Sequence, residues 1–268
     1  MLLYIFSYLA TLLHKLDLIA QQHMFLNILL LFITAFGAGI AVFLIPELNK
    51  EKFKAILSFS GAYLFSITVI HILPELFHES SNPIQAGIFV LMGFFLQMML
   101  EYFTSGVEHG HIHHSHETTA IPYLLLVSLG IHSFLEGTLL VHPSSVHGGE
   151  GATTLMFGLI MHKMPEAFAL MSVLVLQMKN KTLAIGLLVL FALTSPMGMM
   201  MSNALFNMNL ITKDVFGILF ALVAGNFLHI STTIFFESSP EHKFKAQKLL
   251  LSVSGAGMAI LAEYFMGH

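Results

Sequence analysis

The sequence contains no cysteine and no tryptophan, and every one of its 11 Lys or Arg residues is a lysine. The absence of cysteine excludes disulfide bonds and thiolate metal sites. Charge is scarce as well, because only 10% of the 268 residues are Asp, Glu, Lys or Arg, against about 25% in soluble domains. A soluble protein of this size could not cover its surface with so few polar groups. Cytosolic enzymes, nucleic-acid-binding proteins and secreted scaffolds are therefore excluded.

Hydrophobic residues make up 56% of the chain, the mean hydropathy is +0.82, and the apolar residues gather in long runs. A membrane-spanning helix needs about 20 such residues. The runs lack the alternation of strands, and lipid tolerates only helices or closed barrels. The sequence thus predicts an all-α polytopic membrane protein embedded in the lipid bilayer. Eight transmembrane helices are expected, at residues 24–45, 55–73, 84–103, 121–141, 152–177, 183–205, 215–236 and 246–265.

The positions of proline and glycine indicate where these helices end, lose a hydrogen bond or pack closely. Pro74 is expected to close the second helix, whereas Pro165 and Pro196 lie inside the fifth and sixth, where they remove a backbone hydrogen bond. Small residues let membrane helices approach closely. The glycines expected at such contacts are Gly37, Gly39, Gly87, Gly93, Gly255 and Gly257.

The chain divides into an N-terminal segment, residues 1–23, and an eight-helix domain, residues 24–268. The first segment is interpreted either as an interfacial helix or as a short extra helix. Most lysines lie in the connections after the first and fifth helices and before the eighth, which the positive-inside rule places in the cytoplasm. Both termini are therefore expected outside the plasma (inner) membrane, with the connection 104–120 in the cytoplasm.

Ionisable residues inside membrane helices are costly and indicate function. The fourth helix contains His132 and Glu136, and the fifth contains His162 and Glu166, in each case four residues apart and on one helical face. If the two helices are neighbours, their side chains supply two imidazoles and two carboxylates. Such a set suits Zn²⁺, and also Fe²⁺, Mn²⁺ or Cd²⁺. The alternative is that each pair is only a hydrogen-bonded contact between helices.

At these two helices the sequence resembles the ZIP (Zrt/Irt-like) family of divalent-metal transporters. HSFLEG at 132–137 is similar to the family's HNxxD or HNxxE pattern, and HKMPEA at 162–167 to its HExPHE pattern. The resemblance implies a 3+2+3 arrangement with inverted three-helix repeats, elevator-like alternating access and often a homodimer. Further motifs of the family are HILPE at 71–75, LE at 100–101, SPMG at 195–198 and AGNFLH at 224–229.

The resemblance places the principal metal site on His132, Glu136, His162 and Glu166. Many members have a second, adjacent metal site, and its positions here are Ser133, Lys163 and Ser195. None of these is a good metal ligand, so the sequence predicts one transport site. An ammonium at Lys163 is expected to sit where a second cation would bind and to hold both carboxylates ionised.

Other polar residues are candidates for the transport pathway. His71 and Glu75, at the outer end of the second helix, are interpreted either as an outer funnel or as a helix terminus. Asn226 and His229, in the seventh helix, either line the path or pair with another helix. Glu101 and Glu263 are expected to be interfacial anchors.

The connection between the third and fourth helices is rich in histidine, which binds transition metals loosely. A cytoplasmic metal acceptor or sensor is one interpretation of this tract, and a solvated linker is the other. Its histidines are His109, His111, His113, His114 and His116.

The predicted function is a secondary transporter that imports a divalent metal, Zn²⁺ above all. An intramembrane metal-dependent hydrolase and a non-transporting metal sensor are the alternatives. The hydrolase interpretation lacks the HExxH motif, because Lys163 follows His162. A cation-diffusion exporter would be expected to have six spans and a soluble C-terminal domain.

Overall fold

The computed structural model describes residues 24–44, 50–104, 121–140, 150–178, 180–210, 212–237 and 246–266. Two features predicted from the sequence lie outside these residues, namely the N-terminal segment 1–23 and the histidine tract from His109 to His116.

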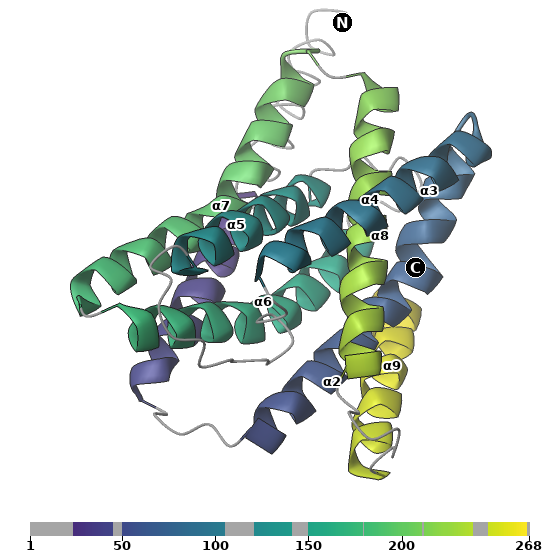
Figure 1. Ribbon diagram of the computed structural model, residues 1–268. Coiled ribbons are helices and arrows are strands. Elements are labelled where there is room, and N and C mark those ends of the chain that lie inside the picture. Colours follow the sequence, from purple (N-terminus) through teal and green to yellow (C-terminus); the bar gives the residue numbers. More distant parts are fainter. Residues whose placement is uncertain are drawn as a thin grey trace, which may run out of the picture.

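Eight helices of the described residues are long and apolar enough to cross a membrane, with mean hydropathies from 1.2 to 2.3. The predicted all-α membrane fold is therefore confirmed (Figure 1). The first helix, Met24–Phe43, ends in a 3₁₀ turn at Ala41–Phe43. The other helices are α2 (Lys50–Ile67) continuing into α3 (Leu73–Glu79), α4 (Pro83–Thr104), α5 (Ile121–Leu139), α6 (Glu150–Gln177), α7 (Lys181–Asn207), α8 (Lys213–Glu237) and α9 (Ala246–Met266).

The predicted end of the second span at Pro74 is wrong. The span runs from Lys54 to Glu79, because a π-helical turn at Thr68–Ile72 joins α2 to α3. Proline lacks an amide hydrogen and its ring clashes with the preceding turn. The wider π turn lies directly before Pro74 and lets the helix continue through it. Pro165 and Pro196 lie inside α6 and α7, as predicted.

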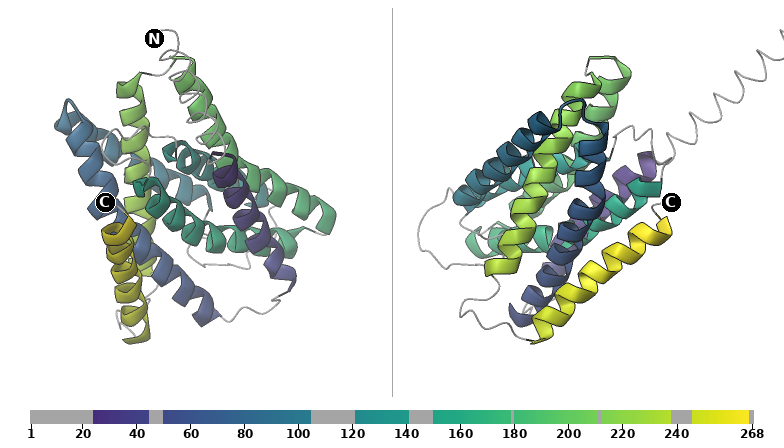
Figure 2. Two further views of the ribbon diagram at one scale, coloured as in Figure 1. Left: turned by 180° about the vertical axis from the view of Figure 1, so that it is seen from behind. Right: turned by 90° about the vertical axis from the view of Figure 1, so that its right-hand side faces the viewer.

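The buried apolar side chains form two clusters. One joins α2, α3, α4, α8 and α9, and the other joins the N-terminal helix, α5, α6 and α7. The most extensive helix pairings are α4 with α8, α5 with α7, and α2 with α9. In Figure 1, α7 lies on the left and α8 and α9 on the right, and in the right view of Figure 2 α9 runs alongside α2. α5 and α6 contribute residues to both clusters and so link the two groups of helices.

Glycines permit the tightest of these contacts. A Cβ atom at Gly93 of α4 would lie 1.9 Å from the carbonyl oxygen of Leu222, and one at Gly225 of α8 would lie 2.0 Å from that of Val90. Gly39 and Gly255 are similarly close to neighbouring helices, which confirms three of the six predicted positions. At Gly37, Gly87 and Gly257 an added Cβ would meet nothing within 4 Å, so a close contact there was wrongly predicted.

Gly93→Ala should lower the free energy of unfolding by about 2 kcal/mol, because the new methyl group cannot fit against a rigid backbone carbonyl. Gly87→Ala, in the same helix, has open space around its Cβ and should be neutral or slightly stabilising. Unfolding of the two purified variants in mixed micelles measures the difference. Equal effects of the two substitutions would contradict the close α4–α8 contact.

Candidate metal centre

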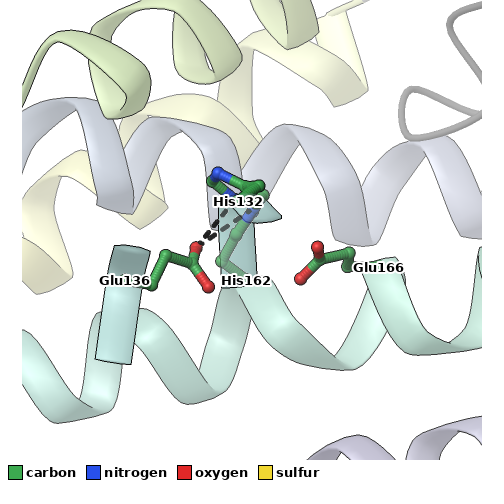
Figure 3. A group of neighbouring side chains, drawn as sticks. All are labelled: His132, Glu136, His162 and Glu166. Carbon is green, nitrogen blue, oxygen red and sulfur yellow. Dashed lines mark ion pairs between the residues drawn. The ribbon is translucent and has the colours of Figure 1, made fainter. Parts of the chain in front are cut away.

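The two His–Glu pairs of the sequence come together at the contact between α5 and α6. His132 and Glu136 lie on α5, His162 and Glu166 lie on α6, and all four are buried. One donor atom from each residue can be chosen so that the four atoms lie within 4.8 Å of one another. In Figure 3 the two imidazoles lie between the two carboxylates. This is the one such group of His, Asp and Glu in the part of the chain that the structure describes.

The donor atoms face a common point. Glu136 Oε1 lies 2.9 Å from His132 Nε2 and 3.8 Å from His162 Nε2, the contacts dashed in Figure 3. The two imidazole rings are almost perpendicular, with centroids 5.8 Å apart. Two buried imidazole nitrogens and two buried carboxylate oxygens form a donor set that suits a divalent transition metal.

Lys163 lies directly beside these residues. Its ammonium donates a short hydrogen bond to Glu136 Oε2 and lies 2.9 Å from Glu166 Oε2. The side chain is 1% exposed, and its nitrogen lies 5.5 Å from the centre of the Phe191 ring. Lys163 therefore contacts both carboxylates, as the sequence predicted, and does not extend to the membrane surface.

Hydroxyl groups from α5 and α7 complete the surroundings of the ammonium. Lys163 Nζ donates to Ser133 Oγ at 2.9 Å, and Ser133 Oγ is 2.8 Å from Ser195 Oγ. Ser195 Oγ in turn donates to the Ser133 carbonyl at 2.8 Å. Lys163, Ser133 and Ser195, which the sequence resemblance assigned to a second-site position, are thus linked by hydrogen bonds.

Glycines bring α7 close enough for these bonds. A Cβ atom at Gly137 would lie 2.0 Å from the Ser195 carbonyl oxygen, and one at Gly198 would lie 2.0 Å from that of Phe134. The HSFLEG and SPMG motifs therefore contact each other backbone to backbone. This close approach places the Ser195 hydroxyl against Ser133.

His71 forms a separate cluster. It lies in the π turn, where its Nδ1 is 2.8 Å from Glu263 Oε1 of α9 and its Nε2 is 3.5 Å from Glu75 Oε2. The sequence interpreted Glu263 as an interfacial anchor, but the structure pairs it with the imidazole. Irregular helical turns are frequent at functional sites.

His229 and Asn226 lie in α8 and contact α4. His229 Nδ1 is 3.3 Å from Glu101 Oε2, so Glu101 also has an imidazole partner rather than serving only as an anchor. The Asn226 amide, with its nitrogen facing α4, donates to the Gly93 carbonyl at 2.6 Å. Both residues thus pair with another helix, which was one of the two interpretations from sequence.

Two further residues around the ammonium were not found by sequence reasoning. Thr194 donates to Ser133 Oγ at 2.8 Å, and Phe191 packs on the ammonium. Thr194 directly precedes the SPMG motif, so its position beside Ser195 was the available signal. Phe191 gave none, because it is one of 25 phenylalanines.

Comparison with known protein families gives a match over residues 108–263 to the family described as ZIP Zinc transporter. This range covers more than half of the chain. The chain belongs to the ZIP zinc transporter family. A search of curated proteins found no significant match.

ZIP proteins transport divalent metals such as zinc, so family membership supports metal transport by this chain. The buried His/Glu group lies within the region that matches the ZIP family. Membership also overturns the cation-diffusion exporter as an alternative, and it gives no support to the hydrolase.

Lys163→Met should lower the free energy of unfolding of the metal-free protein by about 3 kcal/mol, because two buried carboxylates lose their cation. Adding Glu166→Gln should recover part of this loss by removing one negative charge. Denaturation in the presence of a chelator measures both variants. Lys248→Met, in a partly exposed lysine of α9, is the matched control and should have little effect. A wild-type stability in Lys163→Met would contradict a charge-balancing role.

Proposed function

We propose that this ZIP protein imports divalent metal ions, with Zn²⁺ as the main substrate, through a single mid-membrane site by alternating access. The metal would bind His132, Glu136, His162 and Glu166. Lys163, Ser133 and Ser195 would occupy the second-site positions without binding metal. The protein would lie in the plasma (inner) membrane with both termini outside, so that uptake delivers metal to the cytoplasm.

One observation carries the proposal: four buried donor atoms, two from imidazoles and two from carboxylates, lie within 4.8 Å of one another on two packed membrane helices. A charged side chain in the middle of a membrane costs at least about 2.5 kcal/mol. Hydrogen bonds between the helices alone do not require two carboxylates at this depth, and a bound divalent cation would neutralise their charge.

The two hydrophobic clusters support alternating access. The N-terminal helix, α5, α6 and α7 share one cluster, and this group contains all four proposed ligands. α2, α3, α4, α8 and α9 share the other, to which α5 contributes Leu139 and α6 contributes Leu155, Leu159 and Ala169. Movement of the first group against the second would carry the site between the two membrane faces, as in an elevator. Homodimer formation, which the family resemblance implies, stays a prediction.

The separate His–Glu clusters fit the two ends of such a path. With the orientation that the lysines favour, His71, Glu75 and Glu263 lie toward the outer face. His229 and Glu101 lie toward the cytoplasmic face, where α4 leads into the histidine tract. Each cluster offers an imidazole and a carboxylate to an ion that enters or leaves the central site.

Purified protein reconstituted into liposomes should take up radioactive Zn²⁺, and His132→Ala or Glu166→Gln should reduce the uptake by more than about tenfold. That factor is typical of losing a group that only supports a metal ligand, and direct ligands contribute more. His78→Ala, in an exposed histidine of α3, is the matched control and should leave uptake unchanged.

The same experiment separates the alternatives. A metal sensor would bind Zn²⁺ without moving it into the liposomes. A hydrolase would likewise give no uptake but would cleave a substrate in a metal-dependent way. Wild-type protein that binds one Zn²⁺ and transports none would therefore overturn the proposal.

Zn²⁺ affinity should fall as the pH is lowered from about 8 to about 5.5, a range that includes the midpoint of about 6.5 for a free histidine. Protons and metal compete for the same lone pairs of the imidazoles and carboxylates, so acidification favours release. Equilibrium binding of radioactive Zn²⁺ to the detergent-solubilised protein measures this dependence. Affinity that stays constant over this range would contradict direct binding by the two imidazoles.

A further inference from the structure

Lys163 divides the four carboxylate oxygens of the proposed site into two kinds. The Oε2 atoms of Glu136 and Glu166 both face its ammonium. Glu136 Oε1 faces the imidazoles instead. Neither oxygen of Glu166 has a hydrogen-bond partner among the described residues, but Oε2 lies 2.9 Å from the ammonium as an ion pair and Oε1 has no such contact. Each carboxylate therefore has one oxygen next to the lysine and one oxygen left for an ion.

The ammonium is held firmly in this position. It is 1% exposed, donates to Ser133 and lies over the Phe191 ring. Thr194 and Ser195 of α7 brace Ser133 through hydrogen bonds of 2.8 Å. Moving Lys163 away would leave an ammonium and two carboxylate oxygens without partners in an apolar interior, which is strongly unfavourable.

The number of donors available to a metal follows from this arrangement. A carboxylate with both oxygens free can bind a cation through two atoms, but each carboxylate here can offer only one. With one nitrogen from each imidazole, the site presents a four-donor set. Zn²⁺ is stable with four tetrahedral ligands, whereas Mn²⁺ prefers octahedral surroundings rich in oxygen.

We propose that Lys163 is a specificity-determining residue, which favours Zn²⁺ over Mn²⁺ by restricting Glu136 and Glu166 to one oxygen each. This inference rests on the proposed metal site. Charge alone cannot produce the preference, because both ions are divalent and the ammonium repels them equally. Only the number of available donor atoms distinguishes them.

Lys163→Met tests the proposal, because it keeps a long side chain and frees both Oε2 atoms. The dissociation constants of Zn²⁺ and Mn²⁺ are measured separately on the full-length protein in detergent, the first with radioactive Zn²⁺ and the second by electron paramagnetic resonance. The Mn²⁺-to-Zn²⁺ ratio of dissociation constants should fall by about tenfold, which corresponds to about 1.4 kcal/mol of differential binding. Lys248→Met is the control and should leave the ratio unchanged.

If Lys163→Met changes both dissociation constants by the same factor, the lysine acts through its charge alone and the proposal is overturned.

X-ray absorption spectroscopy of wild-type protein with Zn²⁺ bound provides a second measurement that needs no variant. Four nitrogen and oxygen ligands would support the proposal, and a two-oxygen carboxylate contact would overturn it. These experiments measure binding and not transport. If the Mn²⁺-to-Zn²⁺ ratio of dissociation constants changes as expected but the wild-type protein takes up no metal into liposomes, the result would count against the proposed function and not against this inference.

Discussion

The His/Glu centre depends on one constraint: two carboxylates are buried together in an apolar membrane interior and require a nearby positive charge. Lys163 meets that need by contacting both Glu136 and Glu166. The hydroxyl of Ser133 then accepts a hydrogen bond from the ammonium, because an unpaired donor at this depth is costly. Ser133, Lys163 and Ser195, which look unrelated in the sequence, thus form one hydrogen-bonded unit.

Close backbone contacts give this unit its geometry. Gly137 and Gly198 allow α5 and α7 to approach until the hydroxyl groups meet, and Gly93 and Gly225 do the same for α4 and α8. In a membrane, where lipid is as apolar as the side chains, such packing and hydrogen bonding hold helices together. The site is therefore positioned by the helices around it as much as by the helices that carry its ligands.

Much of this was predictable from the sequence, because membrane helices follow from length and hydropathy and residues four apart share a helical face. The pairing of His132 with Glu136 and the position of Lys163 beside the carboxylates followed from these rules and from the ZIP motifs. The path of the chain through Pro74 did not, because proline rules describe regular helices and a π turn is a local adjustment. The partners of Glu101 and Glu263 depend on which helices adjoin, and periodicity within one helix does not encode that.

The charge of the centre has an electrical consequence. Two carboxylates and one ammonium, with neutral imidazoles, leave the empty group with a formal charge of minus one, and a divalent ion changes it to plus one. In the proposed carrier, the loaded group moves inward as a cation and the empty group returns outward as an anion. A membrane potential that is negative inside therefore favours both half-cycles. With the Lys163 ammonium in the centre, the proposed cycle would thus have its voltage dependence divided between the inward and the outward movement.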